Sequence, residues 1–330
     1  MVWVARFFSA FCWLLAAIGL VAIVLVALLA VPVSRPPELP SIRAGAVAID
    51  QSGLPSLSYF HARDGTSLAY RLYPAVDGNT QKIAIVIHGS AGHSTGVNQI
   101  AKRLAAGNYM TVAPDIRGHG ASGTRGDIGY LGQLDNDLQD FLAEMRHEHR
   151  DAHFSLLGFS AGGGFALRVA AGKLAADFDR LVLLSPYLGY DAPSSRTSKG
   201  SAQWADADIP RIIALLMLRR LHFRCCEALP VIAFALRPGA EKLVTTRYSF
   251  RLLANFGPPP DLSAAFRRLK MPTTIIAGAD DELMLSDKYS DIVSGIEPAI
   301  PVKIVPGLGH MDMLHAPAAI DAISDALRIK

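Results

Sequence analysis

The sequence has few cysteines and few charged residues for its length. Its 330 residues include three cysteines, Cys12, Cys225 and Cys226. Cys225 and Cys226 are neighbours, which rarely bond to each other, and Cys12 lies in an apolar run, so no disulfide framework is predicted. Charged side chains make up 18% of the residues and leave a net charge of +3. Such a small charge gives no indication of a nucleic-acid partner, and we expect none.

A long segment near the N-terminus has no charged side chain. Residues 7–33 form a run of 27 residues without a charged side chain. About 20 apolar residues are enough to cross a bilayer, whereas the core of a signal peptide has about 7–15. We therefore predict that residues 1–33 form an N-terminal transmembrane anchor, in preference to a cleaved signal peptide or a buried core helix.

The orientation of this anchor is only weakly indicated. Arg6 precedes the apolar run, and Arg35 and Arg43, offset by Glu38, follow it. The basic residues on the two sides therefore nearly balance, and the positive-inside rule decides little. Because a very short N-terminal tail stays inside most easily, we expect the rest of the chain on the extracytoplasmic side.

After the apolar run, the chain changes to short strands that alternate with helices. Residues 34–56 are rich in proline at their start and predict a stalk. An Asp-Gly turn between two alternating runs predicts a leading hairpin, and β-branched runs such as residues 82–87 predict strands buried in a parallel sheet. Residues 57–189 and 271–330 thus predict one α/β core, a mostly parallel sheet with helices on both faces.

Residues 190–270 interrupt this pattern and predict a helical cap over one edge of the sheet. The segment is apolar and basic, with 13 Lys and Arg against 6 Asp and Glu, and it includes the apolar runs 212–218 and 231–236. In one interpretation the basic cap docks on anionic lipid headgroups or lines an acyl pocket; in the other its apolar helices simply cover the site and its arginines are solvated. The sequence leaves both interpretations open.

One short segment, residues 158–162, has the pattern of a nucleophile elbow. An apolar strand leads into Gly158-Phe159-Ser160-Ala161-Gly162, and a helical pattern follows. Gly158 and Gly162 suit a turn in which strand and helix backbones come too close for a Cβ atom. A second match to the same pattern, at residues 92–96, begins after its strand has ended and is interpreted as a loop.

An acid and a base follow two later strands. Asp281 comes after the apolar run 273–277, and His310 follows residues 302–305 through glycines. A serine hydroxyl needs an imidazole base, and the imidazole needs a carboxylate that fixes its tautomer. The chain order Ser, Asp, His is that of the α/β hydrolases. Asp280, Asp191 and His315 are alternatives for these roles.

The loop after residues 82–87 supplies candidate oxyanion donors. It reads His88-Gly89-Ser90, and it follows the strand expected beside the elbow. Gly89 lets this loop fold so that the Ser90 N–H, with that of Ala161, can face a developing oxyanion. We expect His88 to support the loop by hydrogen bonds.

The sequence resembles the α/β-hydrolase fold, and within it the group that includes lysophospholipases, monoacylglycerol lipases and serine aminopeptidases. The resemblance covers residues 57–190 and 270–330 and implies Ser160 as nucleophile, Asp281 as acid and His310 as base, with Ser90 and Ala161 as oxyanion donors. The family usually has a bulky apolar residue where Ser90 stands, and the cap matches no motif. The matching segments are Arg63–Tyr70, His88-Gly89, Asp115–Ser122, the elbow, Gly278–Asp281 and Gly309-His310.

These observations predict a membrane-anchored serine hydrolase that cleaves carboxylic esters through an acyl-enzyme without a cofactor. A lipid-like ester is favoured, as for a lysophospholipase, a monoacylglycerol lipase or a carboxylesterase. A peptidase or amidase with the same triad is the alternative, with Glu227 or Glu241 to recognise an amine. A non-catalytic membrane scaffold is disfavoured because no triad member is missing. His147, His149 and His153 invite a metal site, but they suit a helix C-terminus, and we expect none.

Overall fold

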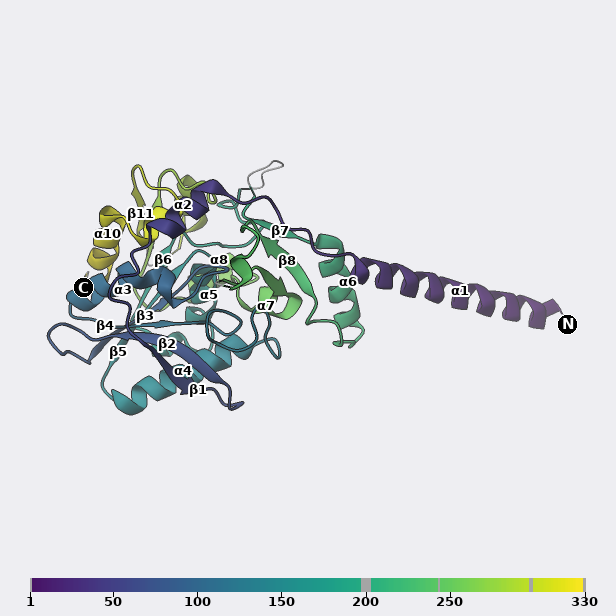
Figure 1. Ribbon diagram of the computed structural model, residues 1–330. Helices are drawn as coiled ribbons and strands as arrows, with labels where there is room; N and C mark the ends of the chain where they lie inside the picture. Colours follow the sequence, from purple (N-terminus) through teal and green to yellow (C-terminus); the bar gives the residue numbers. More distant parts are fainter. Residues whose placement is uncertain (1, 197–202, 243, 297–298, 329–330) are drawn as a thin grey trace.

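The computed structural model describes residues 2–196, 203–242, 244–296 and 299–328. Its centre is an eight-stranded sheet in the order β1-β2-β4-β3-β5-β6-β10-β11 (Figure 1). The strands are β1 Leu57–His61, β2 Ser67–Tyr73, β3 Lys82–Ile87, β4 Met110–Pro114, β5 His153–Phe159, β6 Arg180–Leu184, β10 Thr273–Gly278 and β11 Val302–Val305. The expected mostly parallel sheet is therefore confirmed.

The first two strands form the predicted hairpin, and the other strands run parallel to one another. β1 pairs antiparallel with β2, and β2 pairs antiparallel with β4. All later pairings, from β4 and β3 to β10 and β11, are parallel. The carboxyl ends of the parallel strands consequently meet at one edge, where α/β proteins build their sites.

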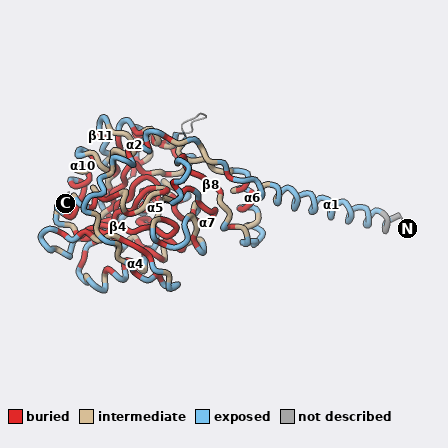
Figure 2. Tube along the Cα trace, viewed as in Figure 1, coloured by how far each residue is buried: buried red, intermediate tan, exposed pale blue. Residues whose placement is uncertain are grey.

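Helices cover both faces of the sheet. Ile100 of α3 and Ile323 of α10 pack with Val86 of β3 in the core on one face. Phe141 of α4 and Phe165 of α5 belong to the core on the opposite face. Figure 2 shows the resulting buried centre. The helices of this part are α3 Asn98–Ala106, α4 Gln133–Glu148, α5 Ala161–Ala170, α9 Tyr289–Ile292 and α10 Pro317–Arg328.

The cap contains a small sheet in addition to the expected helices. Strands β7 Ala205–Ala207, β8 Pro230–Phe234 and β9 Arg247–Ser249 form an antiparallel three-stranded sheet. The described part of the cap also contains the helices α6 Ile209–Arg220, α7 Phe250–Asn255 and α8 Leu262–Arg268 and a short 3₁₀ helix, Ala240–Lys242. The prediction of a purely helical cap is therefore wrong at residues 231–236, most of which form the central strand of this small sheet. Residues 197–202 and 243 of the cap lie outside the described part.

The N-terminal apolar run forms one long helix, α1 Val2–Ala30. It extends away from the rest of the molecule and meets it beside α6 (Figure 1). The most apolar 18-residue stretch within Arg6–Ala30 has a mean hydropathy of 2.9 and no buried residue, so the helix is long and apolar enough to cross a membrane. Figure 2 shows it exposed over most of its length.

The segment expected as a proline-rich stalk packs along the domain instead. It contains the helix α2 Pro40–Ala48, whose Ile42 is buried together with the preceding Leu39. The Leu39 N–H donates to the Ala235 carbonyl of the cap, at 3.3 Å. Gly45 lies against Met311, which follows His310. The end of α1 is thereby tied to both the cap and the core.

Candidate active site

Ser160 occupies the sharp corner between β5 and α5. Its backbone has φ 53° and ψ −120°, a conformation that a residue with a Cβ rarely adopts. Two hydrogen bonds hold the corner: the Ser160 N–H donates to Leu184 O, and the Tyr187 N–H donates to Ser160 O, each at 2.9 Å. A Cβ at Gly158 would collide with the Gly162 carbonyl. The elbow therefore needs glycine there, as the sequence pattern predicts.

His310 and Asp281 form a buried pair at the ends of β11 and β10. The His310 Nδ1–H donates to Asp281 Oδ2 at 2.8 Å, and the Asp281 side chain is fully buried. Asp281 Oδ1 accepts the backbone N–H groups of Leu283 and Met284 at 2.9 and 2.8 Å. Burial pushes the pKa of this carboxyl upward, but the charge and hydrogen bond of His310 outweigh it and hold the pKa below its ordinary value. The carboxyl group of Asp281 thus favours its ionised form, and it accepts the hydrogen bond of the His310 ring.

The alternative acids and base lie elsewhere. Asp280 and Asp191 are exposed. His315 faces Asp312 at 3.5 Å. The structure thus brings His310 to Asp281 and to neither of the other two aspartates.

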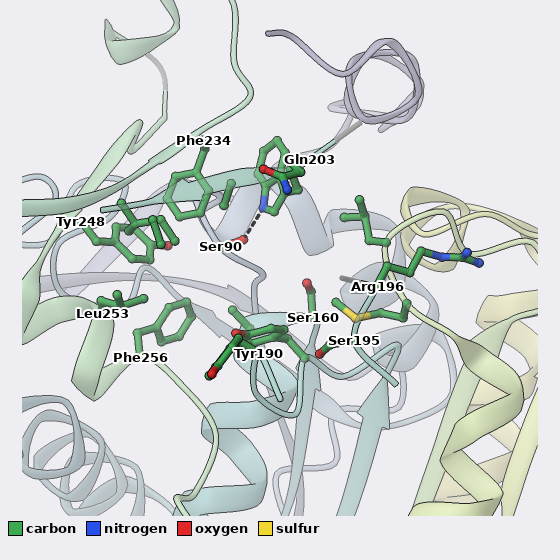
Figure 3. Close-up of a pocket in the computed structure, with 18 of the residues that line it drawn as sticks. Ser90, Ser160, Tyr190, Ser195, Arg196, Gln203, Phe234, Tyr248, Leu253 and Phe256 are labelled. Atoms are coloured by element: carbon green, nitrogen blue, oxygen red, sulfur yellow. Dashed lines mark hydrogen bonds between the residues drawn. The ribbon is translucent and has the colours of Figure 1, made fainter. Parts of the chain in front are cut away.

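The imidazole lies beside the elbow. The rings of Phe159 and His310 are 4.8 Å apart between centroids, and Phe159 directly precedes Ser160. Within the described residues, Ser160 and His310 are not joined by a hydrogen bond. Such bonds are often long in unliganded enzymes and tighten when substrate is bound. The Ser160 hydroxyl points into the pocket instead (Figure 3).

The backbone N–H groups of Ser90 and Ala161 are both unpaired among the described residues. Ser90, Ala161 and Ser160 line the same pocket. Gly89 brings the loop against the elbow, because a Cβ there would lie 2.9 Å from the Phe159 ring and 3.3 Å from Ser160 Cβ. Two free donors beside a serine hydroxyl are the arrangement that an oxyanion hole requires.

His88 supports this loop from inside the core, together with His119. The Ile116 N–H donates to His88 Nε2 at 3.2 Å, so His88 Nδ1 carries the proton and donates to Gly89 O at 2.8 Å. Burial lowers the pKa of His88 to about 4 and lowers that of His119 well below its ordinary value. Both imidazoles are therefore neutral parts of the scaffold.

These two histidines predict that stability falls in mild acid. In the unfolded chain both bind a proton near pH 6.5, whereas in the folded protein His88 stays neutral to about pH 4 and His119 also resists protonation. Their contribution to the free energy of unfolding is complete above pH 6.5 and is lost as the pH falls. By pH 4, protonation linked to His88 alone lowers the free energy of unfolding by about 3 kcal/mol. We expect the melting temperature to be constant from pH 8 to 7 and to fall steadily between pH 6.5 and 5.

The exposed His61 on β1 provides the control for this titration, because His61→Gln should keep the same slope. Thermal melts followed by circular dichroism measure it. A melting temperature that stays flat from pH 7 to 5 would contradict buried, neutral His88 and His119.

The pocket above Ser160 is mostly apolar and has a volume of about 320 Å³. The cap residues Phe234, Tyr248, Leu253 and Phe256 form one side of it (Figure 3). Ser195, Arg196, Gln203 and Glu282 give the pocket a polar part. Sequence reasoning missed Glu282, whose Oε2 accepts the His310 N–H at 2.9 Å. Glu282 directly follows Asp281 in the sequence, and this adjacency could have pointed to it.

Sequence reasoning also missed two cap residues that touch the oxyanion loop. The Trp204 Nε1–H donates to Ser90 Oγ, and the Ala91 N–H donates to the Tyr248 hydroxyl, each at 2.8 Å. Neither residue stands in a motif, so no sequence signal pointed to them.

No group of three His, Cys, Asp or Glu side chains is close enough to hold a metal ion in the part of the chain that is described. His149 pairs with Glu148 at 3.9 Å, and the exposed His153 faces Asp179 at 3.3 Å.

The sheet order, the antiparallel leading hairpin and the strand–elbow–helix corner define an α/β hydrolase. The chain belongs to the serine aminopeptidase S33 family (Hydrolase_4), whose sequence profile matches residues 78–315.

Similar proteins agree with this assignment. Monoglyceride lipase from Homo sapiens is 29% identical over 164 residues, which cover 49% of this chain and 52% of that protein. Monoacylglycerol lipase from Mycolicibacterium smegmatis is 26% identical over 123 residues, or 37% of this chain and 43% of the lipase. The matches thus span about half or less of these curated relatives.

Solved structures share the fold at low identity. A soluble variant of monoglyceride lipase from Saccharomyces cerevisiae, bound to a substrate analog, has a TM-score of 0.63 and 18% identity over 84% of this chain and 94% of that one. A membrane phospholipase A described as a bacterial virulence factor has a TM-score of 0.55 and 19% identity, over 98% of this chain and 97% of its own.

Proposed function

We propose that this protein is a serine hydrolase that cleaves carboxylic esters, with Ser160 as nucleophile, His310 as base and Asp281 as the acid that orients it. The observation that carries the proposal is the strained elbow, which presents the Ser160 hydroxyl to an apolar pocket beside the buried His310–Asp281 pair. Each of the three side chains follows a different strand of one parallel sheet, so the fold itself brings them to the same edge.

In the proposed mechanism, His310 Nε2 removes the proton of Ser160 Oγ as that oxygen attacks the ester carbonyl. The bond from Asp281 to Nδ1 keeps Nε2 unprotonated and stabilises the imidazolium that forms. His310 then returns the proton to the departing alcohol. A water molecule, activated by the same imidazole, hydrolyses the acyl-enzyme and regenerates Ser160.

The oxyanion of each tetrahedral intermediate is held by the free N–H groups of Ser90 and Ala161. The N–H of Ala161 lies in the first turn of α5, where the helix dipole also favours negative charge. Such donors contribute about 3–4 kcal/mol each to the transition state.

A lipid-like ester is the proposed substrate class. The pocket is lined mainly by apolar and aromatic side chains that suit an acyl chain, among them Ile232, Phe234, Leu253 and Phe256. The lipases and the phospholipase A to which the chain is similar support the same class. The acids considered for amine recognition do not line the pocket: Glu227 pairs with Arg219 at 2.5 Å, and Glu241 lies 3.8 Å from Arg35.

Hydrolysis of matched esters and amides tests this proposal. The full-length protein in detergent is offered a monoacylglycerol, a lysophospholipid, a short soluble ester, and the aminoacyl amide that corresponds to an aminopeptidase substrate. Ester hydrolysis that exceeds amide hydrolysis supports the proposal. Cleavage of the amide alone would replace it by the peptidase alternative.

We further propose that α1 anchors the protein in a membrane with the domain on the extracytoplasmic side, and that α6 rests on the bilayer beside it. Ile213, Leu216 and Met217 are each about half exposed and, at this spacing, share one face of α6. Leu29, near the end of α1, packs against the apolar cluster that contains Leu215 of α6. The exposed Arg220 and Arg224 follow and suit anionic headgroups.

This placement predicts a difference between bilayer-embedded and soluble substrates. In the variant Ile213→Asp/Leu216→Asp, two half-exposed apolar side chains are replaced by charges, which weakens the seating of the cap on lipid by about 2 kcal/mol. We expect a roughly 30-fold lower rate on a lipid ester in anionic vesicles, the factor that corresponds to about 2 kcal/mol, and an unchanged rate on a short soluble ester.

Val76→Asp is the matched control for this experiment, because Val76 is 78% exposed in the loop after β2. It should leave both rates unchanged. Equal rates for the α6 variant and the control on vesicles would contradict the proposed contact.

A further inference from the structure

The loop that carries the Ser90 N–H is held mainly by the cap. Within the described residues, three hydrogen bonds run from the cap to Ser90 and Ala91. The Trp204 Nε1–H donates to Ser90 Oγ at 2.8 Å, and the Thr245 N–H donates to Ala91 O at 3.0 Å. The Ala91 N–H in turn donates to the Tyr248 hydroxyl at 2.8 Å. Both polar backbone atoms of Ala91 are thus bonded to cap residues.

The loop needs such support because its backbone is strained. Ala91 has φ 62°, in the left-handed region that residues with a Cβ avoid. A conformation of this kind costs about 1–3 kcal/mol and persists only where the surroundings hold it. Among the described residues, the core adds the bond across the turn from the Gly92 N–H to Gly89 O at 3.2 Å and the bond from the His88 Nδ1–H to Gly89 O at 2.8 Å, and neither of these reaches Ala91. The cap contacts at Ala91 therefore decide whether the strained turn, and with it the direction of the preceding Ser90 N–H, is kept.

Tyr248 connects the cap to His119, in the scaffold below the loop. Its side chain is 2% exposed, and its hydroxyl is 2.6 Å from His119 Nε2. His119 Nδ1 is bonded to Ile116 O at 3.1 Å, so Nε2 accepts and the tyrosine hydroxyl donates. The hydroxyl can then accept the Ala91 N–H with its lone pair, and both of its hydrogen-bonding roles are filled.

Aromatic contacts fix the position of this hydroxyl. The Tyr248 ring meets Phe234 edge to face at 4.7 Å and His119 at 5.1 Å between centroids. Burial raises the pKa of Tyr248 above its ordinary range, so the hydroxyl keeps its proton. A fixed, protonated hydroxyl offers the Ala91 N–H one defined acceptor position.

We propose that Tyr248 is a positioning residue for the oxyanion hole: through Ala91, the cap holds the Ser90 N–H in the orientation that stabilises the transition state. The cap then contributes to the rate of the chemical step as well as to the shape of the pocket. This inference rests on the proposed function of Ser90 as an oxyanion donor.

The variant Tyr248→Phe tests the proposal, because it removes the hydroxyl and keeps the ring. With a short soluble ester, we expect kcat to fall roughly 10- to 100-fold, part of the loss seen when an oxyanion donor is removed, while KM changes less than twofold. A trifluoromethyl ketone, which forms a tetrahedral oxyanion on the serine, should bind more weakly by the same factor as kcat/KM falls.

Tyr73→Phe is the matched control. The Tyr73 residue is likewise buried and its hydroxyl donates to Asn98 Oδ1 at 2.9 Å, and neither of these two residues lines the pocket. Its removal should lower the melting temperature without changing kcat. If Tyr248→Phe does not fold, the variant Ser90→Ala takes its place. It removes the hydroxyl that accepts the Trp204 hydrogen bond from the cap and leaves the Ser90 N–H. We expect kcat to fall about threefold, which corresponds to the lower end of the free energy that one hydrogen bond contributes.

The outcomes separate this inference from the proposed function. A Tyr248→Phe protein with wild-type kcat and inhibitor affinity, in an enzyme that Ser160→Ala inactivates, would overturn the positioning role alone. A fall in kcat shared equally by Tyr73→Phe would also overturn it, as a general effect of stability. Absence of ester hydrolysis by the wild-type protein would overturn both.

Discussion

Replacing Ser160 by alanine is expected to lower kcat on a soluble ester by roughly 10⁴- to 10⁶-fold while the protein stays folded. The substitution removes the only proposed nucleophile, and the pocket and the free N–H groups that remain can accelerate attack by water only weakly. The elbow should tolerate alanine, because the strained φ of 53° is held by backbone hydrogen bonds to Leu184 and Tyr187 and not by the hydroxyl. Initial rates and a thermal melt measure the two parts of this prediction.

The second match to the elbow pattern supplies the control. Ser94 lies in residues 92–96 and is fully buried at the start of a short 3₁₀ helix, Ser94–Val97. Its N–H donates to Asp115 at 2.7 Å, so Ser94→Ala keeps that bond. We expect Ser94→Ala to retain wild-type kcat. Wild-type activity in Ser160→Ala would contradict the assignment of Ser160 as the nucleophile.

Replacing Asp281 by asparagine is expected to lower kcat by about 10⁴-fold. The amide of the asparagine can donate a hydrogen bond to His310 Nδ1, so that Nδ1 carries no proton. The ring proton then lies on Nε2, and in this tautomer His310 cannot accept the proton of Ser160. Shape is preserved, so the loss should appear in kcat more than in KM. Measurement of both constants, with a melting curve, separates this effect from unfolding.

Asp280 is the matched control for Asp281, since it is the neighbouring residue and is exposed. Asp280→Asn should have wild-type activity, and so should Asp191→Asn. If Asp281→Asn were fully active and Asp280→Asn or Asp191→Asn were inactive, the inactive variant would identify the acid. The 2.8 Å hydrogen bond between Asp281 and His310 would then have no catalytic role.

The core of the fold could be predicted because its strands carry local signals. Residues 82–87 are almost all apolar and β-branched, and they form β3 over the same residues. The cap could not be predicted in the same way. Residues 231–236 are an equally apolar run, and periodicity alone does not separate a buried strand from a helix. Most of that run became β8 because β7 and β9 pair with it, and those partners are distant in sequence.

The residues of the candidate site also differ in whether their local sequence predicts them. Ser160, Asp281 and His310 each follow a predicted strand, and the parallel topology alone brings strand ends together. Tyr248 and Trp204 reach the oxyanion loop only through the packing of the cap. Nothing in their local sequence indicates that contact, because it depends on residues more than 100 positions away.

Labelling with a fluorophosphonate probe tests the central claim most directly. The probe phosphonylates an activated serine oxygen with loss of fluoride, and it needs both the base and the oxyanion hole. Mass spectrometry of the digested wild-type protein should find the adduct on Ser160, and the Ser160→Ala protein should remain unlabelled. An adduct on another serine, or a folded wild-type protein that is not labelled at all, would contradict the account.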